Sequence, residues 1–163
     1  MENFNRIEEK IIKFWQAHNI FQLSVEKNKN NKPFVFVEGP PFANDKPHIG
    51  HFLTRIYKDV ILRFKNMLGY YVERVAGWDT HGLPIEVATE KFLNLSNKKE
   101  VINYGIDRFN NICRELVMKY KKDWEDFDKR IGFWIDHQRS YITYETHYME
   151  SCWWLIKKIY DQG

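Results

Sequence analysis

The chain has 163 residues, of which 44% are hydrophobic and 17% aromatic, which excludes a disordered chain and allows one domain with a core. Its net charge of +3 is too small to argue for nucleic-acid binding by itself. The start lacks the basic and apolar runs of a signal peptide, and no stretch approaches the roughly 20 apolar residues that span a bilayer. Cys113 and Cys152 form no metal or redox motif, so we expect reduced thiols in a cytoplasmic protein.

Apolar residues recur at helical spacing from Phe4 to His18. This pattern predicts an amphipathic helix that packs on the main domain. A polar loop over residues 26–32 follows it. The sequence therefore predicts an N-terminal helical appendage and linker over residues 1–32 and a main domain over residues 33–163.

The main domain opens with a predicted strand, helix and strand. Pro33 introduces residues 34–38, a run that is too short for a helix and rich in β formers, which predicts a buried parallel strand. An apolar stripe over residues 51–68 predicts a helix, and Gly69 is a suitable C-terminal cap. Residues 70–76 predict a second strand, so these segments form a βαβ unit with a right-handed crossover.

Helices dominate the rest of the chain. The pattern predicts a short helix over residues 84–93, a loop over 94–99, a long helix with an apolar face over 106–131 and a final helix over 146–163. Acids and bases alternate over residues 119–129, which favours a solvated helix face over an RNA contact. Doubly wound nucleotide-binding sheets have two halves. We find one βαβ unit, so the predicted fold class is α/β, the first half of a Rossmann-like parallel sheet.

Two loops rich in Gly, Pro and His, residues 38–51 and 77–86, follow the two predicted strands. Ligands bind at the carboxyl ends of strands in open α/β sheets, so we expect two walls of one nucleotide site. If the helix begins near Pro47, His48 and His51 lie in its first turn on the same face. A helix N-terminus favours anions, and imidazoles there can donate hydrogen bonds to phosphate oxygens in a phosphoryl or nucleotidyl transition state.

Other roles are compatible with these residues. Two histidines three positions apart on a helix can hold zinc, although no cysteine or acidic cluster completes the ligand set apart from the distant His81 or Asp79. Two structural histidines at a helix start are also compatible, because four residues are a weak motif. Asp79 could instead be a helix N-cap or an acid in a surface turn. We predict no bound metal in this segment.

The context of the histidines resembles the class I aminoacyl-tRNA synthetases, whose first signature is His-Ile-Gly-His after the first strand. It is most similar to the isoleucyl family over four motifs, Gly39-Pro-Pro-Phe-Ala-Asn44, Pro47-His-Ile-Gly-His51, Val72-Glu-Arg74 and Gly77-Trp-Asp-Thr-His-Gly-Leu-Pro-Ile-Glu86. Thr80-His81 favours this family over the valyl and leucyl ones. The resemblance covers the chain from the N-terminal helix onward.

The resemblance implies a Rossmann-like fold of the HIGH-type nucleotidyltransferases, with an N-terminal helix and C-terminal helices. It also implies a ligase that uses ATP with Mg²⁺ to activate L-isoleucine and then charges tRNA(Ile). His48 and His51 would be catalytic. The ATP-binding residues would be Phe42, Ala43, Asn44, His48, Gly50 and His51. The amino-acid-binding residues would be Gly39, Pro40, Pro41, Asp79 and His81, with Asp79 accepting the substrate's α-ammonium group.

The resemblance further implies that this chain is part of a longer, monomeric, cytoplasmic protein without a membrane partner. The chain would end before the editing insertion and, lacking the Lys-Met-Ser-Lys-Ser loop, would not have full activity alone. Asp45-Lys46 departs from the family's glycine and apolar residue. Since Asp tolerates left-handed backbone angles, we expect the turn to survive, with Lys46 adding a cation near the phosphates.

Three alternatives remain at the level of sequence. The chain could be a non-catalytic remnant or binding module that retains an adenosine-nucleotide site. It could be a valyl-type or leucyl-type segment. It could also be a small nucleotidyltransferase with a His-x-Gly-His motif that acts on a metabolite, although the later strands of such an enzyme are not evident.

Overall fold

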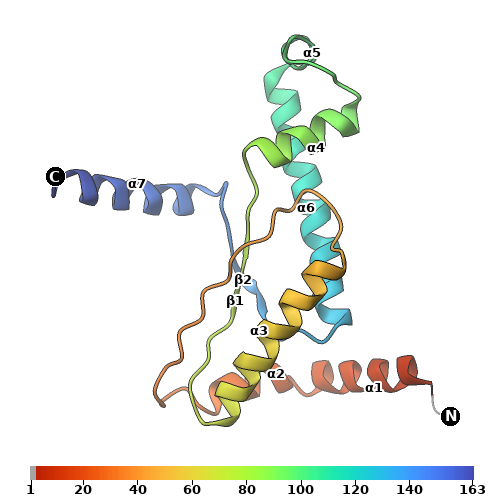
Figure 1. Cartoon of the computed structure of the whole chain (residues 1–163), viewed down its shortest axis with the longest axis vertical. Coiled ribbons are helices and arrows are strands. Elements are labelled where there is room, and N and C mark those ends of the chain that lie inside the picture. Colours follow the sequence, from red (N-terminus) through yellow and green to blue (C-terminus); the bar gives the residue numbers. More distant parts are fainter. Residues whose placement is uncertain (1–2) are drawn as a thin grey trace. The chain divides into compact units, whose positions relative to one another are not determined.

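The computed structural model describes residues 3–163. In chain order its elements are α1 (Phe4–Ala17), α2 (Ile20–Glu26), α3 (Ile49–Met67), β1 (Val75–Trp78), α4 (Leu83–Leu93), α5 (Lys98–Tyr104), α6 (Ile106–Arg130), β2 (Asp136–Ile142) and α7 (Thr146–Tyr160) (Figure 1). The chain divides into two compact units. The first contains the residues up to 38, 47–75 and 125–136, and the second contains 39–46, 76–124 and 137–163.

β1 and β2 form a two-stranded sheet. Near their starts the Asp136 N–H donates to the Arg74 carbonyl at 2.7 Å, and at their ends the Thr143 N–H donates to the Trp78 carbonyl at 3.2 Å. Both strands therefore run in the same direction. All residues of the sheet except Val75 and Asp136 belong to the second unit.

Aromatic rings and a guanidinium hold the first unit together. Trp15 of α1 meets Trp134 edge to face at 5.1 Å. The guanidinium of Arg63, on α3, lies 3.7 Å from the centre of the Trp134 ring. Contacts of this kind stabilise by cation–π attraction as well as by burial of the rings. The predicted N-terminal helix is confirmed, and Gly69, with φ +90°, follows the end of α3 as the predicted cap position requires.

The second unit has a separate apolar core. Its buried members come from the loop before α3, from β1, α4, α6 and from β2, namely Ala43, Trp78, Ile85, Val117, Trp124 and Ile142. The predicted helix over residues 84–93 is confirmed as α4, which begins one residue earlier. The predicted loop at 94–99 is partly wrong, because a short helix, α5, begins at Lys98. Gly105, at φ +101°, separates α5 from α6, since this backbone conformation cannot continue a helix.

The predicted buried strand at residues 34–38 is wrong. In the structure Pro33 and Tyr71 form an isolated parallel bridge, and the Phe34 N–H donates to the Tyr71 carbonyl at 2.8 Å. Beyond that bridge the segment is extended but covered on one face only. Val35 and Val37 are 79% and 78% exposed. A strand requires a neighbour along its length, and the structure places that neighbour only at the first residues.

The predicted βαβ unit is confirmed only in part. The segments before and after α3 meet in two isolated parallel bridges, Pro33–Tyr71 and Phe42–Asp79, but residues 34–38 form no regular strand. The second strand begins at Val75 and not at Tyr70, and it pairs with β2. The sequence did not predict β2, because its residues, Asp-His-Gln-Arg-Ser-Tyr-Ile, lack the alternation of apolar and polar side chains that marks a half-buried strand.

Candidate functional site

The histidine pair lies at the start of α3, in the first unit. His48 is the N-cap residue, and its Nδ1 accepts a hydrogen bond from the Gly50 N–H at 3.1 Å. The Nδ1 of His51 accepts in turn from the His48 N–H, also at 3.1 Å. The two imidazoles thus form a reciprocal capping box. The helix begins at Ile49 and not near Pro47, because the His48 side chain caps it.

This capping arrangement determines which ring nitrogens carry protons. A nitrogen that accepts a hydrogen bond presents its lone pair, so each neutral ring carries its hydrogen on Nε2. The ring centroids lie 3.7 Å apart, which confirms that both histidines share one face. Burial lowers the pKa of His51, and the charges of His48 and Arg55 lower it further. The pair therefore carries two Nε2–H donors at the positive end of a helix dipole, where phosphate oxygens bind well.

Gly50 has a local structural reason to be glycine. A Cβ at this position would lie 3.0 Å from Cε1 of His48. The His48 ring occupies this space while it caps the helix. A Cβ at this position would require the ring to shift by a few tenths of an ångström, so glycine gives the capping ring its space.

A buried ion cluster supports α3 one turn beyond His51. Arg55 Nε donates to Asp128 Oδ1 at 2.6 Å, and Arg55 Nη1 lies 3.3 Å from Glu38 Oε1. Lys58 also pairs with Glu38. The side chains of Arg55, Glu38 and Asp128 are at most 5% exposed. Burial raises the pKa of Asp128 to about 6, even though Arg55 lowers it.

Asp79 lies directly after β1, in the second unit. Its N–H donates to the Pro41 carbonyl at 3.0 Å, and its carbonyl accepts from the Ala43 N–H at 3.0 Å. These two bonds join the Gly-Pro-Pro loop to the Trp-Asp-Thr-His loop through the backbone. The sequence predicted both segments as parts of an amino-acid pocket, and within this unit they are in direct contact.

The other predicted residues of this unit differ in exposure. The Ala43 side chain is 1% exposed and belongs to the core, which leaves its backbone as the group that could meet a ligand. Phe42 is 43% exposed. Gly39 and His81 are exposed, whereas Pro40, Pro41, Asn44 and Asp79 are half-buried.

Thr80 fixes the Trp-Asp-Thr-His loop on the side opposite the Gly-Pro-Pro loop. Its N–H donates to Thr143 Oγ1 at 3.0 Å, and the two hydroxyl oxygens lie 3.1 Å apart. The Tyr144 N–H donates to Thr80 Oγ1 at 3.1 Å. Both threonine side chains are buried. The sequence offered no signal for this partnership, because the two threonines are 63 positions apart.

The unusual Asp45-Lys46 turn is held without a left-handed residue. The Lys46 N–H donates to Asp45 Oδ1 at 2.7 Å, and the Trp124 indole donates to the Asp45 carbonyl at 2.9 Å. Among the described non-glycine residues, only Asn19 and Asn94 have positive φ. The turn survives as expected, but through side-chain hydrogen bonds and not through a left-handed aspartate.

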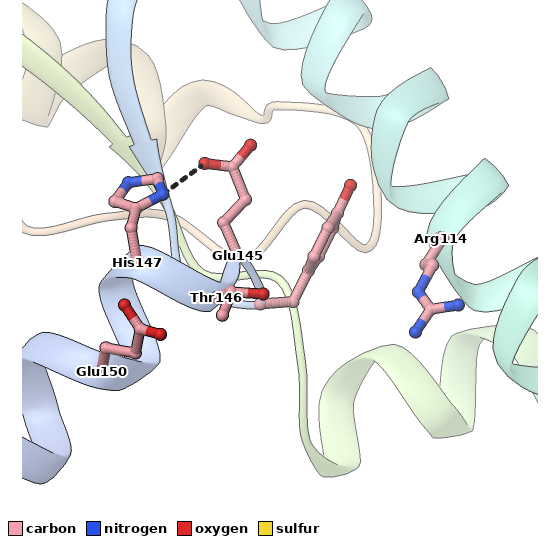
Figure 2. Close-up of a pocket in the computed structure, with 6 residues that line it drawn as sticks. Arg114, Glu145, Thr146, His147 and Glu150 are labelled. Carbon is pink, nitrogen blue, oxygen red and sulfur yellow. Dashed lines mark ion pairs between the residues drawn. The ribbon is translucent and has the colours of Figure 1, made fainter.

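A pocket of about 720 Å³ in the second unit contains none of the predicted residues. Figure 2 shows that most of its lining comes from the start of α7, with Arg114 from α6 on the opposite side. The lining residues are Arg114, Tyr144, Glu145, Thr146, His147 and Glu150. His147 Nδ1 lies 3.5 Å from Glu145 Oε2. The pocket thus carries charges of both signs.

Among the described residues, no further side chain completes a zinc site with the histidine pair. Within residues 3–163 no group of three His, Cys, Asp or Glu side chains is arranged to hold a metal ion. Over the same residues, no helix combines the length and apolar character needed to cross a membrane. Cys113 and Cys152 are both unpaired thiols.

Comparison with known proteins assigns the class. A family model described as tRNA synthetases class I (I, L, M and V) matches residues 10–163. The chain therefore belongs to the class I tRNA synthetase family. A solved structure of LeuRS from Agrobacterium radiobacter, in a ternary complex with tRNA and LeuAMS, matches with a TM-score of 0.71 over 96% of this chain and 17% of that one. At 21% identity this likeness concerns the fold alone, and it agrees with a partial Rossmann-like α/β domain.

Curated relatives narrow the comparison to one member of the class. The chain is 50% identical to isoleucine–tRNA ligase of Thermus thermophilus over 161 residues, 46% identical to that of Clostridium novyi and 44% identical to that of Picrophilus torridus. The matches cover 96–99% of this chain and 15% of each relative. The predicted resemblance to isoleucyl-tRNA synthetases is confirmed, and the chain spans about 15% of the length of these relatives.

Proposed function

We propose that this chain supplies ATP-binding and isoleucine-binding residues of an isoleucine–tRNA ligase. The observation that carries the proposal is the reciprocal cap of His48 and His51, which leaves the proton of each neutral ring on Nε2. In the proposed reaction, a carboxylate oxygen of isoleucine attacks the α-phosphorus of ATP. A new bond forms between this oxygen and the α-phosphorus. The bond from the α-phosphorus to the oxygen that bridges the α- and β-phosphates breaks, and pyrophosphate leaves with Mg²⁺.

The two histidines would act on the phosphates. Negative charge accumulates on the phosphate oxygens as the pentavalent transition state forms, and Nε2–H donors at a helix start stabilise it without covalent chemistry. Gly50 permits the ring position, and we propose that Phe42, Ala43 and Asn44 contribute to ATP binding as the resemblance implies.

Asp79 would bind the amino acid. Its carboxylate would accept a charge-assisted hydrogen bond from the α-ammonium group of isoleucine. We propose that Gly39, Pro40, Pro41 and His81 contribute to the same recognition. The support is the direct backbone contact of Asp79 with Pro41 and Ala43. Transfer to tRNA(Ile) would be an activity of the longer protein, which we propose is monomeric and cytoplasmic.

Calorimetry with ATP and a non-hydrolysable isoleucyl-adenylate analogue tests the proposal. Wild-type protein should bind both, and Asp79→Ala should lose the analogue selectively. His48→Asn and His51→Gln keep an oxygen that can cap the helix, but their shorter amide N–H groups do not occupy the position of the imidazole Nε2–H. Each should weaken ATP binding about tenfold or more without a loss of thermal stability.

His18→Gln is a matched control for the histidine variants. His18 lies in the same unit, and its Nδ1 contacts the Phe14 carbonyl at the end of α1. The substitution should leave ATP binding unchanged. If wild-type protein binds neither ATP nor the analogue, the proposal is wrong, and a remnant that has lost the nucleotide site is the better interpretation.

A further inference from the structure

We propose that the hydroxyl pair of Thr80 and Thr143 is a positioning device that aims the Asp79 carboxylate at the ammonium group of the substrate. The inference rests on the proposed function and adds to it two residues that would act through Asp79 without touching substrate.

Successive residues at the end of β1 bond to opposite sides. Trp78 accepts from the Thr143 N–H, and Thr80 bonds to Thr143 and Tyr144. Asp79, between them, bonds instead to the Pro41–Ala43 segment through its N–H and its carbonyl. This alternation is the pattern of a central strand in a parallel sheet. The backbone at residue 79 is therefore clamped from both sides.

The alternation also sets the direction of the Asp79 side chain. Adjacent side chains along a strand point to opposite faces. The side chains of Trp78 and Thr80 are 1% and 4% exposed, so both point into the protein. Asp79 projects from the other face and is half-buried. Fixing Thr80 inward thus keeps Asp79 outward.

The threonine pair fixes Thr80 after the named strand has ended. β1 ends at Trp78, and the Thr143 N–H supplies the last bond from the β2 side to the β1 backbone. Beyond that point, the Thr143 hydroxyl accepts from the Thr80 N–H, and the Thr80 hydroxyl accepts from the Tyr144 N–H. The hydroxyls replace the backbone ladder for one more residue. At an oxygen–oxygen distance of 3.1 Å, one of the two hydroxyls also donates to the other, in either direction.

Burial makes this arrangement sensitive to the loss of one hydroxyl. Thr143 is 5% exposed, so a valine in its place would leave the Thr80 N–H without its partner and out of reach of bulk water. An unsatisfied buried donor is costly, and the backbone would shift to find another acceptor. Because Asp79 is the preceding residue, that shift would move its carboxylate.

A pair of ligands separates positioning from general stability. One is the non-hydrolysable isoleucyl-adenylate analogue, and the other is the same compound without its α-amino group. Asp79 would contact only the first through the ammonium. We expect wild-type protein to prefer the amino ligand by roughly ten- to a hundredfold, the range for hydrogen bonds to charged groups. Asp79→Asn should remove most of this preference.

The threonine variants should follow the same pattern. Thr143→Val should reduce the preference for the amino ligand by about tenfold and leave affinity for the desamino ligand unchanged, while Thr143→Ser should restore it. Thr89→Val is the matched control, because the Thr89 hydroxyl is equally buried but donates to the Ile85 carbonyl within its own helix. It should leave the preference intact.

Each outcome decides the inference. If Thr143→Val weakens both ligands equally, or neither, the pair is merely structural and the inference is overturned. If Thr143→Val does not fold, as judged by circular dichroism, Thr80→Val makes the same test from the other hydroxyl. If wild-type protein binds both ligands equally, the assigned role of Asp79 and the inference fail together. If wild-type protein binds neither ligand, the proposed function fails first.

Discussion

The two units hold their predicted functional residues by different physical means. In the first unit, buried charges anchor α3, the helix that carries the histidines, through the Glu38, Arg55 and Asp128 cluster. In the second unit, neutral hydroxyls and backbone groups anchor Asp79 through Thr80 and Thr143. A charge cluster changes with pH and fails severely when one partner is removed, whereas hydroxyl pairs are insensitive to pH. The first unit should therefore be the more sensitive of the two to charge and acidity.

The largest expected effect comes from removing the central charge of the first unit. Arg55→Ala would leave two buried carboxylates without the guanidinium between them and should lower the free energy of unfolding by about 3–5 kcal/mol. Urea denaturation measures this loss. Arg130→Ala, which breaks the exposed pair with Glu8, is the control and should cost less than about 1 kcal/mol. An Arg55→Ala loss no larger than that of the control would contradict a charge-based anchor.

The stability of the first unit should also depend on the protonation of Asp128. Its pKa is raised from 3.8 to about 6, so folding favours the protonated carboxyl. The resulting stabilisation is complete below pH 3.8 and is lost as the pH rises through 6. Asp128→Asn should remove this dependence, which unfolding measurements between pH 3.5 and 7 would detect as a changed slope. An Asp128 carboxyl that titrates near 4 by NMR would refute the prediction.

The second unit should be more sensitive to shape. An added Cβ at Gly77 would overlap the ring of Tyr141, which stacks on Tyr148 at 5.6 Å. Gly77→Ala should therefore cost about 1–3 kcal/mol through displacement of the ring. Thermal unfolding provides the measurement. Gly39→Ala is the matched control, since no atom lies within 4 Å of its added Cβ. Equal melting temperatures for the two variants would contradict the prediction.

The histidine cap should give a smaller effect that depends on pH. The pKa of His51 is lowered, so its contribution to stability is present above the unfolded value of 6.5 and is lost as the pH falls through the folded value. The reason is that a proton on Nδ1 ends its acceptance of the His48 N–H. His51→Gln, which can cap at any pH, should reduce the difference in melting between pH 5 and 7.5. The effect should be about 1 kcal/mol or less, and an unchanged difference would argue against the capping box.

The smallest expected effect concerns a buried cation of the first unit that has few partners. Arg74 is 1% exposed, its guanidinium lies 3.9 Å from Asp59, and burial lowers its pKa to about 10. The guanidinium carbon of Arg74 lies 5.9 Å from the centre of the Trp134 ring. Arg74→Met keeps an unbranched side chain of similar length and removes a poorly solvated charge, so stability should change by less than about 1 kcal/mol or increase slightly. A loss of several kcal/mol in urea denaturation would mean that the charge itself supports the unit.

The local patterns of the chain were sufficient to predict the longer helices and the family, but not the short helices α2 and α5. Apolar spacing predicted α1, α3, α4 and α7 within a few residues, because an apolar stripe at helical spacing can be read from the sequence whether or not the fold covers it. The motif around His48 identified the family, and the same spacing brought the two histidine rings together. These features depend on residues three or four positions apart.

Local patterns in the sequence could not predict which distant segments pair. The run at residues 34–38 has the composition of a strand, but a strand forms only where another segment supplies its hydrogen bonds. β2 has an unremarkable composition, and it is a strand because β1 lies beside it. The Arg55–Asp128 and Thr80–Thr143 partnerships join residues 73 and 63 positions apart, which periodicity cannot connect.

The sequence by itself therefore determined the longer helices, the two signature loops and the class of protein, since these follow from short-range spacing and from motif identity. Tertiary structure alone decided which segments pair as strands, which nitrogen of each histidine accepts a hydrogen bond, and how Asp79 is clamped between two neighbours. The physical reason is that hydrogen bonds and buried charges are satisfied by whichever groups the fold brings within about 3 Å, regardless of their separation along the chain.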